Sequence, residues 1–296
     1  MDRQLLKGYG SFILSLLIFG TNGVLAHYIT LGSNDIVLWR LLIGPVTLLL
    51  LFVATRHKFT FYHFRKDLVY LAISGVSMAA SWLLLFAAYN YIGIGVSTVL
   101  HYVGPVIVIA TSPFFFKEHI HVTTIIGILV VILGVILINL DSFGNEISTQ
   151  GVIISLVSAV AFASATIFNK RCVNIAGMEN AIFQMLFALV ATVIFMAFTS
   201  GFDLDITSHD WMFILVLGVL NTGIALFLYF WPLRILPAQA FSVCGYLEAV
   251  SAVIFGMIFL HQSLEALSLI GSICVVGGAV FSEIFRQRRR RHGNTS

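Results

Sequence analysis

Residues 93–118 read GIGVSTVLHYVGPVIVIATSPFFFKE, and a related pattern returns 144 residues later within residues 236–264, LPAQAFSVCGYLEAVSAVIFGMIFLHQSL. At that shift Val99, Tyr102, Val106 and Phe115 fall on Val243, Tyr246, Val250 and Phe259. Self-similarity at one fixed period is the signature of an internal repeat. The fold is therefore expected to contain two similar halves of a chain of 296 residues.

The same shift extends the match in both directions along the chain. It pairs Leu42 with Leu186, Leu84 with Leu228, Gly127 with Gly271 and Gly134 with Gly278. Near the start of each half the shift is 143, which places FGTN at 19–22 over FASA at 162–165. The identities are sparse but keep register, and they divide the chain into a first repeat, 1–145, and a second, 146–296.

The composition predicts an all-α integral membrane protein. Hydrophobic residues make up 59% of the chain, charged residues only 10%, and the mean hydropathy is +1.01. A soluble domain carries about 25% charged residues. A soluble fold of this size still exposes about a quarter of its surface, so it could not hide this much apolar area. Cys172, Cys244 and Cys274 are far apart and are interpreted as small packing residues.

Ten runs are long enough to span a bilayer, which takes about 20 apolar residues. They are residues 9–29, 35–55, 68–91, 96–116, 122–140, 151–170, 180–200, 211–231, 238–260 and 266–285. Each half holds five spans, an odd number, so the second half must enter the membrane upside down relative to the first. Two inverted five-helix repeats around a central cavity are the architecture of many secondary transporters.

The short loops fix an expected orientation. All but one of the 16 lysines and arginines lie at one end of the predicted bundle. The loops at the other end carry aspartate and glutamate and neither lysine nor arginine. Short cytoplasmic loops are enriched in lysine and arginine. Both termini are therefore expected in the cytoplasm, in a multi-pass protein of the cell inner membrane. The basic tail RQRRRRHGNTS is interpreted as an anchor for that orientation, not as a nucleic-acid site.

At this point the sequence resembles a family, the drug/metabolite transporter superfamily of EamA type, over essentially its whole length. The matching elements are IFGTNGV at 18–24, with Phe19 where Trp is usual, LWRLLIG at 38–44, and the stretch 93–118, which carries Pro105 and ends in Glu118. In the second copy Ala249 and Gln262 replace the corresponding Pro and Glu. The resemblance implies a ten-helix carrier of small metabolites or drugs, often an exporter, with a central cavity.

Glu248 is the most informative polar residue. It lies eleven residues after Pro237, which at 1.5 Å per residue places it near the middle of the membrane. A carboxylate there must be paired, protonated or open to a water-filled cavity. Two interpretations stay open, a site for a substrate ammonium or a proton, and a neutral structural hydrogen bond. The repeat partner of Glu248 is Gly104, beside Pro105, so one half supplies a charge and the other a potential backbone break.

Arg40 is the one cation outside the basic loops. It lies five residues after Asp35 in the second span. An arginine at this depth could pair with Glu248 across the cavity, or it could extend outward to Asp35 and the headgroups. Direct substrate contact is the third possibility. The sequence does not decide among these roles.

Further candidate substrate contacts come from aromatic and small polar residues. Tyr102 and its repeat partner Tyr246 could stack on a substrate or serve as a gate, and His101 precedes Tyr102. The remaining candidates are Asn22, Trp82, Ser81, Asn221 and Tyr229. Ser81 belongs to a stripe with Ser74 and Ser77 that either lines a cavity or lets two helices pack closely. The glycines at 127, 134, 271 and 278 indicate close helix contact within the chain or a homodimer seam.

The predicted function is secondary transport of a small metabolite or drug, with an amino acid or amphipathic amine as one option. Export is what the family resemblance implies. No nucleotide-binding GxxxxGK[ST] motif is present, which argues against ATP-driven pumping. The alternative is a membrane-embedded enzyme or a channel, although no GxSxG or HExxH motif occurs. We expect no cofactor, no metal site and no catalytic residue. The expected partners are the substrate and the lipid bilayer, with a second copy of the chain in a homodimer as an open option, and no nucleic acid.

Overall fold

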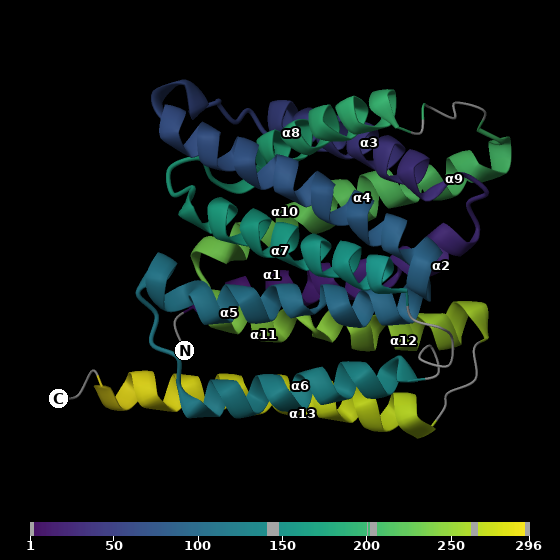
Figure 1. The fold of residues 1–296 in the computed structure, drawn as a ribbon. Helices are drawn as coiled ribbons and strands as arrows, with labels where there is room; N and C mark the ends of the chain where they lie inside the picture. The colour runs from purple at the N-terminus through teal and green to yellow at the C-terminus, as the bar shows by residue number, and fades with distance from the viewer. Residues whose placement is uncertain (1–2, 141–147, 200, 202–205, 262–265, 294–296) are drawn as a thin grey trace.

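The computed structural model of the chain describes residues 3–140, 148–199, 201, 206–261 and 266–293, and the regular structure within these residues is entirely helical (Figure 1). Both ends of the described chain lie at the same end of the bundle (Figure 1). We call this the basic end, because all the loops with lysine or arginine lie there, and the opposite one the acidic end. Gln262 and most of the loops at the acidic end fall outside the described residues.

The helices follow the predicted spans closely. They are α1 Arg3–Gly20, α2 Asn22–His27, α3 Ser33–Ala54, α4 Arg65–His101, α5 Val103–Phe116, α6 Val122–Ile138, α7 Thr149–Arg171, α8 Gly177–Phe198, α9 Ser208–Val216, α10 Ala225–Phe230, α11 Ala238–Gly245, α12 Leu247–Leu260 and α13 Ala266–Gly293. Short 3₁₀ turns cover Phe61–His63 and Trp231–Arg234, and a π-helix covers Leu217–Ile224 between α9 and α10.

The ten predicted passages are present. Within the described residues, eight helical stretches are long and apolar enough to span a membrane, and Val122–Ile138 is a shorter apolar helix. The longest stretch, Arg65–Phe116, contains two passages, because the chain reverses at Gly93, which has φ 75° and ψ 167°. A positive φ is accessible to glycine without steric strain, which accounts for glycine at this turn.

Both halves break a helix at the same repeat position. The fourth passage breaks at Tyr102, between α4 and α5, and the ninth breaks at Tyr246, between α11 and α12. The sequence offered a potential break beside Pro105 in the first half, and the structure shows one at Tyr102 and a second, for which the sequence offered no candidate, at Tyr246. Pro105 lies in the first turn of α5, where a missing N–H leaves no helical hydrogen bond unmade. The breaks therefore belong to the repeat and not to the proline.

The inversion of the halves is also visible in their hydrogen bonds. Asp210 accepts from the backbone N–H of Thr30 at 2.9 Å and from its hydroxyl at 2.8 Å, at the acidic end. Asp67, 143 residues earlier, accepts from the backbone N–H of Asn174 at 2.5 Å, at the basic end. Carboxylates at equivalent repeat positions thus bind the backbone of equivalent loops at opposite ends of the molecule.

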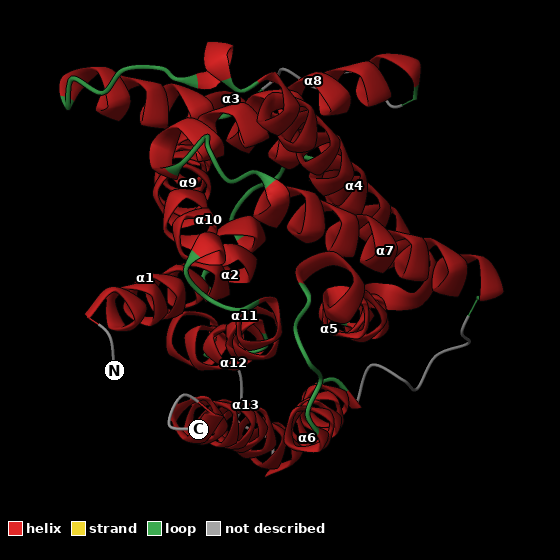
Figure 2. Ribbon diagram, turned by 90° about the vertical axis from the view of Figure 1, so that its left-hand side faces the viewer, coloured by secondary structure: helices red, strands yellow, loops and turns green. Residues whose placement is uncertain are grey.

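The glycine stripes bring α6 and α13 together, and the pair lies side by side at one edge of the bundle (Figure 2). A Cβ on Gly134 would lie 2.5 Å from the carbonyl oxygen of Gly271, and a Cβ on Gly127 would lie 2.8 Å from that of Gly278. Only glycine permits so close an approach. The stripes therefore form a contact between the two halves, and this face is not available as a homodimer seam.

The serine stripe on α4 serves helix packing. Ser74 donates to the carbonyl oxygen of Ala165 at 2.5 Å, and Ser77 and Ser164 share a hydrogen bond at 3.1 Å. Both contacts join α4 to α7, the pair of helices in the most extensive contact. Of the two interpretations of the stripe, close packing is the one that the structure supports.

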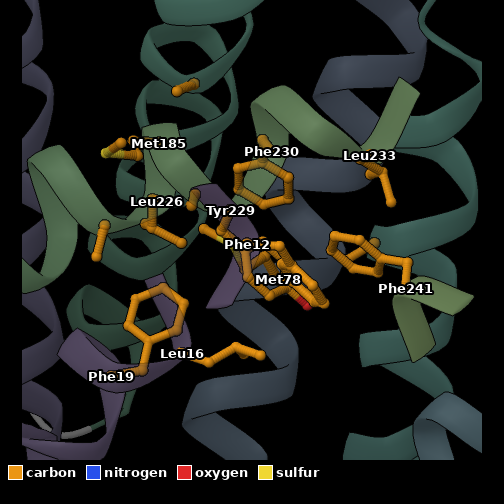
Figure 3. Packing of buried hydrophobic residues seen from close by; sticks show 14 of the residues in the cluster. Phe12, Leu16, Phe19, Met78, Met185, Leu226, Tyr229, Phe230, Leu233 and Phe241 are labelled. Atoms are coloured by element: carbon orange, nitrogen blue, oxygen red, sulfur yellow. The ribbon is translucent and has the colours of Figure 1, made fainter. Parts of the chain in front are cut away.

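Aromatic side chains fill the bundle toward the basic end. Phe12 of α1 stacks on Phe241 of α11 with ring centroids 4.1 Å apart, and Tyr229 of α10 contacts both rings (Figure 3). Phe12 and Phe241 are essentially inaccessible to solvent. This cluster separates the centre of the bundle from the basic end.

Candidate functional site

A cavity of about 510 Å³ opens from the centre of the bundle toward the acidic end. Its mouth is lined by His27, Ser33 and Ile94, which lie at helix ends, and its floor carries Arg40 and Glu248. A second space of about 100 Å³ continues from the floor and shares both charged residues with the first. The cavity therefore leads from one side of the bundle to its middle, where the aromatic cluster stops it.

Arg40 lies almost fully buried on α3 and is held by two contacts. Its Nε donates to the hydroxyl of Thr222 at 2.9 Å, and its guanidinium carbon lies 4.5 Å from the centre of the Trp82 ring. A cation over an aromatic face is attracted by the negative charge of that face. Arg40 makes no ion pair with a carboxylate of the described residues, so neither the pair with Glu248 nor the outward extension to Asp35 is found.

Glu248 lies in the first turn of α12, directly after the break at Tyr246. Among the described residues its carboxylate accepts no hydrogen bond, although Arg40 is near enough to act on it through its charge. A carboxylate in a membrane interior is stabilised by a paired cation, by protonation or by water. Glu248 therefore offers an unoccupied acceptor on the cavity floor.

The π-helix Leu217–Ile224 places two polar side chains beside the floor. Its wider turn brings the hydroxyl of Thr222 to Arg40, and the Nδ2 of Asn221 to the α1–α2 junction. There Asn221 donates to Ile18 O, Thr21 Oγ1 and Asn22 Oδ1 at 2.9 to 3.0 Å. Single π-turns are rare and occur preferentially at functional sites.

Seven of the ten predicted substrate contacts line the cavity. These are Asn22, Arg40, Trp82, His101, Tyr102, Tyr229 and Glu248. His101 is fixed by a hydrogen bond of 2.8 Å between its Nδ1 and the hydroxyl of Ser158. The structure thus brings residues from both halves to the lining of one cavity. Their contact with a substrate stays a prediction.

The other three predicted contacts are not among the residues that line these two spaces. Tyr246 is fully buried and donates to the carbonyl oxygen of Tyr102 at 2.5 Å, which ties the two helix breaks together. Ser81 is buried against α7, where its carbonyl oxygen accepts from Ser158. Asn221 does not line the cavity itself, and its Nδ2 donates to Oδ1 of Asn22, which does.

Several lining residues were not singled out in the sequence. The aromatic wall also contains Phe86, Tyr89 and Phe162. Thr222, which binds Arg40, was also missed, because its role depends on the π-helix and no residue type in GVLNTGI predicts a π-helix. Phe162 could have been found, since it starts the FASA element that aligns with FGTN.

The basic end is closed by polar contacts as well as by the aromatic cluster. Lys170, near the end of α7, donates to the carbonyl oxygens of Leu233 and Leu236 at 3.0 and 2.6 Å. Glu118, after α5, accepts from the backbone N–H groups of Ala238 and Gln239 at 2.7 and 3.2 Å. These charged groups satisfy backbone atoms at the end of one helical segment and the start of the next.

Comparison with known proteins gives one family. A family model described as the EamA-like transporter family matches the chain twice, at residues 6–140 and 149–283. Each match covers one half of the chain.

Two relatives and one solved structure are similar to this chain. The uncharacterized transporter YxxF of Bacillus subtilis (strain 168) is 22% identical over 93% of this chain and 89% of its own length. The riboflavin transporter ImpX of Fusobacterium nucleatum is 26% identical, over 41% of this chain and 42% of its own. A crystal structure with 14% sequence identity superposes with a TM-score of 0.78 and covers 95% of this chain and 98% of that one, which shows the shared fold.

Proposed function

The chain belongs to the EamA-like transporter family, and from this premise we propose that it carries a small metabolite or drug across the cell membrane by alternating access. The coarser statement, that it is a multi-pass membrane transporter, follows from the family and from its apolar helices. The substrate, the direction and the mechanism belong to the proposal.

The observation that supports alternating access is the one-sided cavity. The space of about 510 Å³ reaches the acidic end, while Phe12, Tyr229 and Phe241 fill the bundle toward the basic end. In a fold made of inverted repeats, exchanging the conformations of the two halves would close the open end and open the closed one. A channel would instead need a path through both ends in one state.

We assign substrate contact to Glu248 and Asn22 on the floor of the cavity, beside Arg40, and to the aromatic wall that Trp82 and Tyr229 form. A cavity of this size falls within the range of about 300 to 1,000 Å³ that ligand pockets occupy. Apolar walls with a few charged groups suit a small amphipathic molecule, such as an amine or an amino acid. This lining is the support for that substrate class.

The orientation and direction complete the proposal. We place the basic end, with both termini, in the cytoplasm of a cell inner membrane, because short basic loops stay on that side. The cavity would then face outward in this state. Net export rests on the family resemblance. A homodimer, if it forms, would use a face other than the α6–α13 contact.

Counterflow in reconstituted vesicles tests the function. Vesicles preloaded with an unlabelled compound from a panel of amines and amino acids should take up the labelled compound saturably, and loading the opposite side should reveal any preferred direction. Hydrolysis of the compound without flux would favour the membrane enzyme, and flux that does not saturate would favour a channel.

Glu248→Gln is the matched variant for this experiment. It keeps the size of the side chain and removes its charge, so we expect normal insertion, an unchanged melting temperature and a loss of most counterflow. A variant with full counterflow at every pH would contradict the assignment of Glu248 to the site. A variant that fails to fold would show that the carboxylate has a structural role.

A further inference from the structure

The cavity floor contains two opposite charges that do not pair. Arg40 and Glu248 line the same two spaces and interact through their charges. In a membrane interior an unpaired ion is strongly disfavoured, so a flexible arginine would be expected to reach for the carboxylate. Something must hold the guanidinium where it is.

Thr222 provides that restraint. Its hydroxyl donates to the carbonyl oxygen of Leu217 at 3.0 Å, five residues earlier in the π-helix, which commits the hydroxyl proton. A lone pair of the same oxygen is then free to accept from Arg40 Nε at 2.9 Å. The hydroxyl is therefore fixed in the polarity that a guanidinium requires.

The position of Thr222 is fixed by packing as well. Its Cγ2 lies 2.7 Å from where a Cβ on Gly44 would stand, so α3 admits the threonine only because residue 44 is glycine. Gly44 is one turn after Arg40 on the same helix. Both residues therefore face the π-helix, and Thr222, buried to 0% exposure, cannot move away from the guanidinium without leaving this contact.

The second contact of Arg40 acts in the same direction. Its guanidinium lies 4.5 Å from the Trp82 ring centre, across the cavity floor from α3. Thr222 and Trp82 together hold the guanidinium in place, and Glu248 is left with no hydrogen-bond donor among the described residues. The acceptor that a ligand meets on the floor is thus negative.

We propose that Thr222 is the positioning residue that keeps Arg40 away from Glu248, so that the site selects a monovalent organic cation over an anion. This inference rests on the proposed function and names the substrate class of the same site. The cationic group meets Glu248, and the apolar body of the ligand lies against the aromatic wall that includes Tyr89 and Phe162.

The test compares binding of two probes of similar shape and opposite charge, tritiated 2-phenylethylamine and tritiated 3-phenylpropionate, to the purified full-length protein. The wild type should bind the amine saturably and the carboxylate weakly or not at all. Thr222→Val preserves the shape but removes the acceptor, so Arg40 should turn to Glu248 and weaken amine binding by about tenfold or more. Thr222→Ser keeps the hydroxyl and should bind like the wild type.

A double variant separates this role from a loss of folding. In Arg40→Gln with Thr222→Val no guanidinium remains to occupy Glu248, so amine binding should return toward the wild-type value. A role of Thr222 in stability alone would predict that the double variant binds no better than Thr222→Val. Melting temperatures measured on the same samples identify variants that do not fold. If Thr222→Val is one of them, Thr222→Ser decides, since a folded serine variant that does not bind the amine like the wild type contradicts the proposed role of the hydroxyl.

The outcomes distinguish the inference from the proposed function. Equal amine binding by the wild type and a folded Thr222→Val overturns the role of Thr222, and a wild type that prefers 3-phenylpropionate overturns the cation selectivity. Either result leaves saturable counterflow of another compound intact. Failure of the proposed function would show as the absence of saturable counterflow for every compound in the panel.

Discussion

Lys170 is expected to hold the basic end closed, and its removal should shift the protein toward a state that is open there. The ammonium group donates to the carbonyl oxygens of Leu233 and Leu236 at 3.0 and 2.6 Å. These carbonyls follow α10, at the junction with α11, and have no continuing helix to receive them. Lys170→Met keeps the apolar stem of the side chain and removes both hydrogen bonds.

The magnitude follows from the number and exposure of these bonds. A hydrogen bond to a charged group contributes about 1.5 to 3 kcal/mol, and Lys170 is only partly buried, so we use the lower value for the pair as a whole. A change of about 1.4 kcal/mol is a factor of ten in an equilibrium constant. The population open at the basic end should therefore increase about tenfold in Lys170→Met.

Cysteine accessibility measures this shift. Ala240 is 3% exposed within the aromatic cluster that closes the basic end, so a cysteine there reacts only in the fraction of molecules that open. On a background without native cysteines, Ala240→Cys should react with a small maleimide about ten times faster in Lys170→Met. A cysteine in place of Ser33, at the mouth of the cavity, should react more slowly in Lys170→Met than in the parent protein, because the acidic end is then closed in more of the molecules.

Lys170→Arg retains a cation with several donors and should label like the parent protein. Equal labelling of Ala240→Cys with and without the methionine would refute the reasoning, since it would show that these bonds do not favour closure. A rise at both reporter positions would indicate general loosening of the fold and would likewise contradict a shift between two states.

Two further predictions concern topology and packing. In intact cells an impermeant maleimide should label a cysteine at position 145 and leave one at position 58 unlabelled. Little background is expected from Cys172, because burial raises the pKa of its thiol to about 11. The reverse labelling pattern would invert the assigned orientation. Gly134→Ala should lower the melting temperature, because overpacking costs about 1 to 3 kcal/mol and its Cβ would lie 2.5 Å from Gly271 O. Gly277→Ala, which has no atom within 4 Å of its Cβ, is the control and should melt like the parent; equal melting of the two variants would show that the α6–α13 contact adapts.

The sequence was sufficient for the passages and for their inversion. Apolar length and loop charge are properties of single segments, so they can be recognised without knowledge of the packing. The repeat aligns Gly127 with Gly271 and Gly134 with Gly278, whereas in the structure Gly127 contacts Gly278 and Gly134 contacts Gly271, in the opposite order. The opposite order arises because one helix enters the membrane against the other. The close packing of the serine stripe, by contrast, depended on which helix faces α4, and the sequence left it open.

The candidate site was predictable in its charges and not in its contacts. Arg40 and Glu248 could be singled out because charge is disfavoured in a membrane at any position. The partners of Arg40 depend on the π-helix, which places Thr222 where a regular helix would place its neighbour, and this change of register has no sequence signal in GVLNTGI. Likewise, the helix break at Tyr246 was not predicted, because that residue is neither proline nor glycine.

The repeat also accounts for which end of the molecule is closed. At the shift of 143 the counterpart of Lys170 is His27, and at the shift of 144 the counterpart of Leu233 is Tyr89. His27 and Tyr89 both line the open mouth of the cavity, so the contact that closes the basic end has its equivalent parted at the acidic end. An ammonium group offers three donors to backbone carbonyls, whereas an imidazole ring offers at most two. The two halves share a fold but differ in this contact, and the stronger donor lies at the end that is closed.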